Sequence, residues 1–428
     1  MRKISKLSLV AAVAVAGFST ANAQPLEEAI KNVETSGSVV YRYDNSKDDR
    51  STSANGQSSD KNYYKIGVNL SSKVNDYVKF NSRFLVANEN GSFADASSIN
   101  NGAATTNGNT TGLDAKNGFD ANPDVSLSHA NFAFTGIQNT TITAGKQGLA
   151  TPWTVAIDSD GNEQTGTGIL ALSTVGPVTA GAGYFNQTNL GKSGNINSSR
   201  NVSVYGISGT ALTDDRDMGS RDIYVGALLA DFSPVKLEAW YLDMADTFDT
   251  YTLVAKADFK PSTDSKLGVE ARYVSLTLDN KQNLNIEKDN AMYRLAVTGN
   301  VGIVNGKVAY TGTDKDGGLT ALDQDAENAT LGWNLTSNGV KNADHWQGVL
   351  GVNILDNLNL SANYGNLKAK DALTNGQKYK AEELYGQLTY KMSKNLSTYL
   401  RYGNFEEKDG STKLKDQDAG RLQVEYTF

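Results

Sequence analysis

Apolar and polar residues alternate along most of the chain. In one run the apolar positions are Tyr64, Ile66, Val68 and Leu70, and polar or glycine residues lie between them. The same period of two recurs within residues 78–86, 251–260, 267–273 and 384–390. Successive side chains of a strand point to opposite faces, and each run has about the ten residues that a tilted strand needs to cross a bilayer. The pattern predicts an all-β chain of membrane-spanning strands.

Short and long connections alternate between these runs. Short turns rich in Gly, Asn, Asp, Ser or Pro are predicted at 73–76, 136–139, 176–177, 233–234, 261–264, 299–302, 356–357 and 393–395. Longer polar connections are predicted at 46–61, 88–124, 148–166, 189–220 and 314–344. Eight short turns and nine longer connections join eighteen strands, and an even number puts both ends of the chain on the periplasmic side.

These counts predict a transmembrane antiparallel up-and-down β-barrel of about 18 strands. No shift in composition marks a second domain, so residues 24–428 are expected to form this barrel alone. A barrel of this size is too wide for side chains to fill and encloses an aqueous channel.

The N-terminus has the three parts of a secretory signal peptide. Arg2, Lys3 and Lys6 are basic, residues 7–18 are apolar, and small residues follow at 21–23. Cleavage before Gln24 is expected, because the apolar run is too short to remain as a transmembrane helix. Residues 1–23 are therefore predicted to be removed after export.

The C-terminus predicts a closing strand. Leu422, Val424, Tyr426 and Phe428 share one face, and polar residues occupy the positions between them. An amphipathic strand that ends in Phe resembles the assembly signal of outer-membrane barrels. The alternative is an edge strand of a soluble sheet. An open edge with so apolar a face would promote aggregation, whereas in a closed barrel no edge is left open.

Charge and cysteine content narrow the function classes. The formal charge is −7, and it becomes −10 once the three cations of the signal peptide are lost. An acidic chain of this kind disfavours nucleic acid as a partner. Cysteine is absent, so stability must come from packing and hydrogen bonds. The mean hydropathy of −0.43 also suits a soluble secreted protein, and the period of two favours the membrane barrel.

The connection after the fifth predicted strand is the candidate functional segment. It carries the acidic residues Asp158, Asp160 and Glu163. This arrangement resembles general porins, in which the loop after strand five folds into the barrel and narrows it; the resemblance implies that these carboxylates lie at the constriction. Inward-facing cations on the early strands would then set up a transverse field that selects solutes by charge. These pore-wall residues are Arg42, Lys65, Lys79 and Arg83. For each cation, ordinary solvation in the lumen is the alternative, and for the acidic segment the alternative is an exposed surface loop.

The same acidic segment resembles half of a calcium loop. Oxygen ligands alternate from Asp158 to Asp160, and a glycine follows at the bend. The twelve-residue EF-hand pattern is missing. A calcium ion held by Asp158, Asp160 and the wall carboxylate Glu270 is one interpretation, and a solvated acidic turn is the other. The pairs Asp314/Asp316 and Asp323/Asp325 fall in a predicted external loop and are expected at the surface.

The sequence argues against an enzyme and predicts no catalytic residues. Its two histidines, His129 and His345, lie within predicted strands. Ser128 lies beside His129, but neighbours on a strand point to opposite faces. No nucleophile elbow or phosphate-binding loop is present in the sequence.

Aromatic residues near the predicted strand ends are expected to form the interfacial girdles of a barrel. They are Tyr41, Tyr43, Tyr64, Tyr273, Tyr364, Tyr390, Tyr402, Tyr426 and Phe428. Trp240, Tyr385 and Tyr399 are the candidates for lumen-facing rings that could bind sugars, and they are scattered along the sequence.

Several segments resemble the major outer-membrane porins of Campylobacter and related epsilon-proteobacteria. They are KLSLVAA at 6–12, ANA at 21–23, PLEEAIKNV at 25–33, SG at 36–37, YRYD at 41–44, TPWT at 151–154 and GTG at 166–168. The resemblance implies an eighteen-stranded barrel, a homotrimer, cation selectivity and calcium near the constriction. No other cofactor is implied.

The sequence therefore predicts an outer-membrane porin that passes small hydrophilic solutes and ions by passive diffusion, with a weak preference for cations. Outer-membrane lipid and further copies of the chain are its expected partners. Two alternatives stay open: a substrate-selective channel, and an adhesin whose barrel displays its loops.

Overall fold

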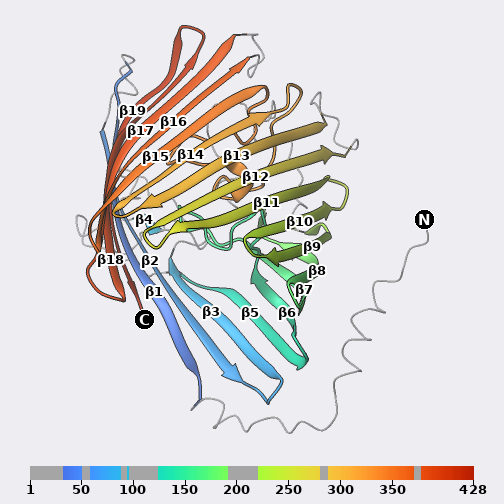
Figure 1. The fold of residues 1–428 in the computed structure, drawn as a ribbon. Helices are drawn as coiled ribbons and strands as arrows, with labels where there is room; N and C mark the ends of the chain where they lie inside the picture. Colours follow the sequence, from blue (N-terminus) through green and yellow to red (C-terminus); the bar gives the residue numbers. More distant parts are fainter. Residues whose placement is uncertain are drawn as a thin grey trace, which may run out of the picture.

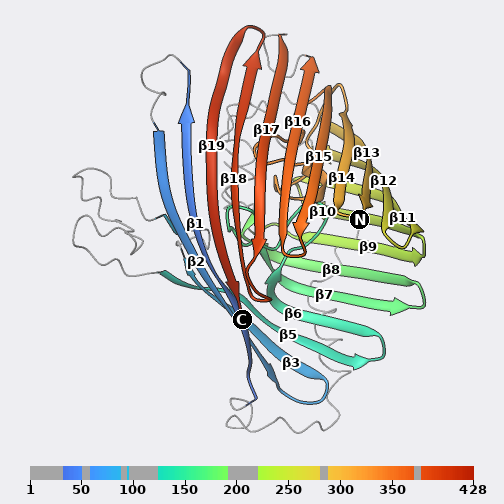
Figure 2. The same cartoon turned by 60° about the vertical axis from the view of Figure 1, so that its left-hand side comes forward.

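A computed structural model describes residues 32–50, 58–87, 94–95, 124–190, 220–279, 288–370 and 377–428. Its strands form one closed antiparallel sheet (Figures 1 and 2). β4 is a two-residue strand beside β2, so eighteen strands make the wall of the barrel. The strands are β1 (Glu34–Asp48), β2 (Ser58–Lys73), β3 (Val78–Ala87), β4 (Ala94–Asp95), β5 (Asp124–Ile137), β6 (Thr140–Gly148), β7 (Thr165–Val175), β8 (Val178–Thr188), β9 (Ile223–Phe232), β10 (Val235–Met244), β11 (Phe248–Ser262), β12 (Ser265–Leu278), β13 (Asp289–Val301), β14 (Val304–Thr313), β15 (Ala343–Leu355), β16 (Leu358–Lys370), β17 (Lys378–Lys391), β18 (Leu396–Asp409) and β19 (Thr412–Thr427).

The barrel closes between its first and last strands. β1 pairs with both β2 and β19, and Ser38 lies opposite Thr427. Gly37 N donates to Phe428 O at 2.9 Å, and Phe428 N donates to Gly37 O at 3.1 Å. Closure leaves neither β1 nor β19 with an open edge. The predicted closing strand and the predicted count of eighteen are confirmed.

The eight predicted short turns are confirmed at one end of the barrel. At the other end, two of the nine connections are also tight turns, at residues 245–247 and 410–411. Each contains a residue in the left-handed region, Asp246 with φ of 58° and Gly410 with φ of 57°. The predicted signal peptide, part of the segment 46–61 and most of the segments 88–124 and 189–220 lie outside the described residues.

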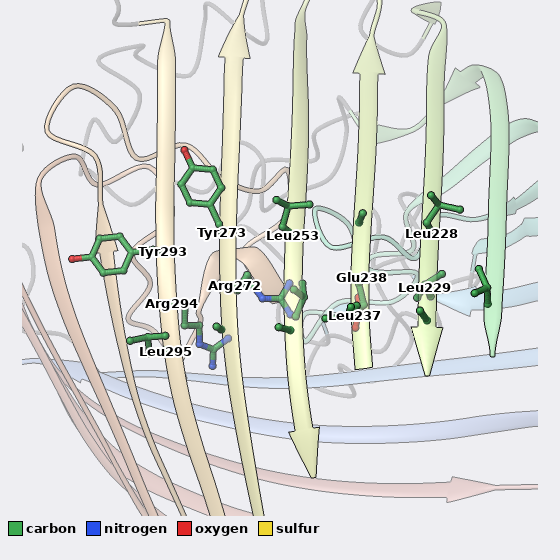
Figure 3. Close-up of a pocket in the computed structure, with 16 residues that line it drawn as sticks. Leu228, Leu229, Leu237, Glu238, Leu253, Arg272, Tyr273, Tyr293, Arg294 and Leu295 are labelled. Carbon is green, nitrogen blue, oxygen red and sulfur yellow. The ribbon is translucent and has the colours of Figure 1, made fainter. Parts of the chain in front are cut away.

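The two faces of the wall differ in polarity, as the alternation predicts. Figure 3 shows a part of the wall where the apolar residue Leu253 and the aromatic residue Tyr273 are close to Arg272, which is the residue after Ala271 on the same strand as Tyr273. Tyr273 is 41% exposed on the outer face, and Arg272 is 3% exposed on the inner face. Tyr41, Tyr364, Tyr390, Tyr402, Tyr426 and Phe428 are also exposed, as a lipid-facing aromatic girdle requires. Among the described residues, no helix has the length and apolar character to cross a membrane.

Two connections pack against the inner face of the barrel (Figure 1). The first inner connection is residues 149–164, between β6 and β7. The second inner connection is residues 314–342, between β14 and β15, and includes a 3-10 turn at Glu327–Ala329. The second was expected outside, with Asp323 at the surface. That expectation is wrong, because Asp323 is fully buried and hydrogen-bonded within the barrel.

An apolar cluster anchors both inner connections. Trp153 of the first is fully buried, and Leu319 and Leu322 of the second pack in the same cluster. The wall contributes Phe185, Ile223, Leu242, Met244, Phe248, Leu276 and Leu278, from β8 to β12. Burial of these side chains fixes the inner connections against this part of the wall.

Candidate functional site

Glu163 fastens the first inner connection to the wall. Its carboxylate accepts hydrogen bonds from Arg83 Nε at 3.0 Å and Arg83 Nη2 at 2.9 Å, and Lys65 Nζ lies 2.8 Å away. Ser128 Oγ donates to the same carboxylate. Burial acts to raise the pKa of Glu163, but the hydrogen bond from Arg83 and the charge of Lys65 together lower it below its ordinary value. Glu163 is therefore an ionised anchor and is 3% exposed.

Asp158 organises the tip of the same connection. Its Oδ1 accepts the backbone N–H groups of Asp160 at 2.9 Å and Asn162 at 2.8 Å, and its Oδ2 accepts Asn162 Nδ2 at 2.7 Å. Gly161, with φ of 78°, supplies the left-handed conformation at the bend. The alternating oxygens that resemble a calcium loop thus form a turn closed by Asp158 itself.

Arg42 and Lys65 of the wall also bind the backbone of this tip. Arg42 Nη2 donates to Ser159 O at 2.6 Å, and Lys65 Nζ donates to Gly161 O at 2.6 Å. Arg42 Nη1 lies 3.7 Å from Asp160, whose side chain is 59% exposed. Of the three predicted acidic residues, Asp160 alone presents most of its side chain to the lumen.

The two inner connections are bonded to each other. Leu322 N and Asp323 N donate to Trp153 O at 2.9 and 3.1 Å, and Asn328 N donates to Pro152 O at 3.1 Å. Ser159 donates through both N and Oγ to Asp325 Oδ2, at 3.0 Å each. Gln164 Nε2 also donates to Asp323. The connections form one body although about 160 residues separate them in sequence.

The second inner connection bonds this body to further strands of the wall. Asn328 Oδ1 accepts from Arg272 at 2.8 Å, and Asn328 Nδ2 donates to Thr252 Oγ1 at 2.8 Å. On β17, the Glu383 carboxylate accepts the N–H groups of Trp333 at 2.7 Å and Leu335 at 3.2 Å. The joined connections therefore link β2 and β3 to β11, β12 and β17 across the interior.

The structure brings together three of the four predicted wall cations. Arg42, Lys65 and Arg83 meet the first inner connection, whereas Lys79 lies 3.7 Å from Glu34 and its side chain is 54% exposed. Sequence reasoning did not single out four further arginines that face the interior in the described strands, Arg272, Arg294, Arg401 and Arg421. The signal was present for Arg272, Arg294 and Arg401, because each lies between outward apolar residues in an alternating run.

Carboxylates gather where the two inner connections meet. Asp158, Asp323 and Asp325 each place an oxygen within 4.8 Å of the others. Burial, and after it the charge of Asp323, raises the pKa of Asp158 to about 7. Glu270, expected to complete a calcium site, instead lies 3.3 Å from Arg272 and 3.8 Å from Arg294.

Each inner connection exposes a carboxylate whose arginine partner is buried, and Lys315 of the second connection is also exposed, at 74%, beside Asp316. The side chain of Glu327, which pairs with Arg272 and lies 3.8 Å from Lys256, is 59% exposed, as is that of Asp160. The arginine side chains that hold them are 1% exposed for Arg272 and 6% for Arg42. Water in the lumen therefore meets carboxylates more than it meets their cationic partners.

Comparisons with known proteins agree with this architecture. The family model described as Campylobacter major outer membrane protein matches residues 1–428. No curated protein matches the chain. Among solved structures, Pseudomonas aeruginosa OpdQ is similar with a TM-score of 0.67 at 16% identity, covering 94% of this chain and 99% of that one. P. aeruginosa OccK8 (OprE) has a TM-score of 0.68 at 15% identity, covering 93% and 98%. Acinetobacter baumannii OccAB2 has a TM-score of 0.66 at 16% identity, covering 92% and 98%. At these identities the likeness is one of fold.

Proposed function

This chain belongs to the Campylobacter major outer membrane protein family, and we propose that it forms a water-filled channel for passive diffusion of small hydrophilic solutes and ions. The observation that carries the proposal is the body of two joined inner connections, which crosses a barrel too wide for wall side chains to fill. In this proposal the body is the constriction. Solutes are selected by the width and charge beside it, with no chemical step.

The distribution of charge supports a weak preference for cations. Asp160 and Glu327 each expose 59% of the side chain, from the first and second inner connections respectively. Their cationic partners lie behind them against the wall and are largely buried. In a narrow aqueous passage with low-dielectric walls, the field of these carboxylates attracts cations and repels anions. Paired cations behind them weaken the field, so the preference is modest.

A divalent cation fits the carboxylates at the junction of the inner connections. Asp158, Asp323 and Asp325 supply only oxygen ligands, as Ca²⁺ requires, and their turn geometry already aims them at one another. We propose Ca²⁺ there, held by Asp158 with Asp323 and Asp325. The bound cation would neutralise like charges that otherwise oppose the contact between the two connections.

Export and assembly complete the proposal. The predicted signal peptide directs the chain to the outer membrane, with cleavage before Gln24. The apolar outer face meets lipid, and a homotrimer follows from the family resemblance. A monomeric mass in mild detergent would contradict the trimer and leave the channel intact.

The decisive experiment is single-channel recording of the purified protein in a planar bilayer under a salt gradient. We expect discrete ohmic steps and a reversal potential of the cation-selective sign, shifted toward zero in the double variant Asp160→Asn, Glu327→Gln. The matched control is Asp231→Asn, because Asp231 lies at a turn at the far end of the barrel. Absence of steps from folded protein would refute the channel and favour the adhesin. A surface adhesin would instead lose partner binding on deletion of residues 88–124.

A further inference from the structure

Three aromatic rings surround one arginine on the inner wall. The guanidinium carbon of Arg401 lies 5.0 Å from the ring centre of Trp333, 5.0 Å from that of Tyr385 and 5.3 Å from that of Tyr399. Trp333 and Tyr385 are themselves in edge contact, with ring centres 5.5 Å apart. These four residues form the aromatic–arginine cluster. They come from the consecutive strands β17 and β18 and from the second inner connection, which precedes β17 in the sequence by two strands.

The cluster faces the lumen. On β17 and β18 the outward residues are even-numbered, as shown by Leu384 at 57% exposure and Leu400 at 55%. Tyr385, Tyr399 and Arg401 are odd-numbered and therefore point inward. All are of intermediate exposure, so the cluster is in contact with water and is not part of a sealed core.

Arg401 differs from its neighbouring arginine in its partners. Arg421, beside it on β19, donates two hydrogen bonds to Asp44 at 2.6 and 2.9 Å. Arg401 donates through Nε to Gln387 Oε1 at 2.8 Å, and no carboxylate in the described part of the chain lies within 4.0 Å of its guanidinium nitrogens. Its charge is stabilised by the ring faces, and its two terminal amino groups keep donors available for a solute.

Hydrogen bonds from neighbouring residues restrict the movement of the cluster. Glu383 accepts the backbone N–H of Trp333 at 2.7 Å and that of Leu335 at 3.2 Å, which holds the backbone that carries Trp333 beside β17. Tyr399 Oη donates to Gln423 Oε1 at 3.1 Å, and Arg42 donates to the same oxygen. A side chain held by neighbours loses little freedom when a solute binds, which favours recognition.

We propose that Trp333, Tyr385, Tyr399 and Arg401 form a solute-binding station on the channel wall for small carboxylates that carry a ring. A guanidinium presents parallel N–H donors that match a carboxylate, and the aromatic faces pack on the apolar ring of the solute. The inference rests on the proposed channel function. Binding must be weak for solutes to leave again, so the station would concentrate such acids beside a constriction that otherwise disfavours anions.

The test is block of single-channel current by benzoate, with acetate, benzyl alcohol and glucose as comparison solutes at equal concentration. We expect benzoate to produce a saturable block that acetate and benzyl alcohol do not. In Arg401→Gln the concentration for half-block should rise roughly ten-fold, as expected when a charge-assisted hydrogen-bond pair is lost. In Arg401→Lys the concentration for half-block should lie between the values for the wild type and for Arg401→Gln, because a point charge replaces the planar donor pair. In the control variant Arg294→Gln, benzoate should block the current at the same concentration as in the wild type.

Several results would overturn the station and leave the channel standing. They are equal block by benzoate and acetate, equal block by glucose and benzoate, or undiminished benzoate block in Arg401→Gln. Absence of conductance steps in the wild type would instead refute the channel itself. A second measurement does not depend on the arginine variants. Benzoate should quench tryptophan fluorescence of the folded wild type, and Trp333→Phe should remove that quenching; quenching that persists in Trp333→Phe would refute the station.

Discussion

The two inner connections are held in place by different chemistry. The first, residues 149–164, is anchored by one buried carboxylate, Glu163, between Arg83 and Lys65. The second, residues 314–342, meets the charged wall residues Glu383 and Arg272, but its own fold is held by buried amides and hydroxyls. Asn338 is typical: its Oδ1 accepts the N–H groups of Thr320 at 2.9 Å and Ala321 at 3.1 Å, and it is 1% exposed.

The difference explains why one segment can be suspected from sequence and the other is mistaken for surface. A buried ion pair needs charged residues, which are visible in a polar loop. A network of Asn, Thr, Ser and Ala has the composition of a solvated loop, and the chain reveals its burial only when the partners are in place. A charged anchor can be predicted from the sequence, whereas an anchor made of amides has the composition of an ordinary surface loop.

The largest effect is expected from Glu163→Gln. Arg83 and Lys65 would remain buried without a counter-charge, which costs about 3 kcal/mol of the free energy of unfolding. Urea unfolding in detergent micelles, followed by the electrophoretic mobility of the folded barrel, measures this loss. The matched control is Asp160→Asn, because Asp160 is exposed and its ion pair contributes little. Equal losses in the two variants would show that the first connection is not anchored by Glu163.

A smaller loss is expected from Asn338→Ala. It leaves buried N–H groups of Thr320 and Ala321 unpaired, at a cost of about 2 kcal/mol. Limited proteolysis of the folded barrel should then cleave within the second inner connection. Asn334→Ala serves as control, because among the described contacts only the backbone N–H of Asn334 takes part in a hydrogen bond. Cleavage of both variants at the same rate would argue against the amide network as the anchor.

The junction between the connections should respond to pH and to calcium. Burial raises the pKa of Asp158 to about 7, so its contribution to stability is fully present at low pH and is lost as pH rises through 7. Bound Ca²⁺ should restore the lost stability at high pH. Calcium affinity, measured by calorimetry, should fall roughly ten-fold between about pH 8 and about pH 6, because the ligand must lose its proton. Asp158→Asn should abolish that dependence, and a pH-independent affinity in the wild type would refute the assignment.

The smallest effects separate the contributions of the two connections to selectivity. Asp160→Asn tests the first and Glu327→Gln tests the second, since both side chains are 59% exposed. Each should reduce the ratio of cation to anion permeability by roughly two-fold or less, because exposed charges are screened by salt. Reversal potentials at low and high salt measure this. A shift from one variant only would assign the selectivity to a single connection.

The sequence by itself determined the wall of this protein. A period of two over about ten residues specifies a strand and its inner and outer face, and Gly, Asn, Asp, Ser and Pro specify the short turns, because both are local properties of the backbone. The count of eighteen strands and the inward phase of Arg42, Lys65 and Arg83 follow from that pattern.

Only the tertiary structure decided what fills the interior. Asp158, Asp160 and Glu163 look alike in sequence, yet Glu163 is buried between two cations, Asp158 closes a turn and Asp160 faces the lumen. Asp158 meets Asp323 and Asp325, and Trp333 meets Arg401, across separations that no local pattern encodes. Such contacts form when closure of the barrel brings distant strands around the same space, and the polar groups of the loops then pair with one another instead of with water.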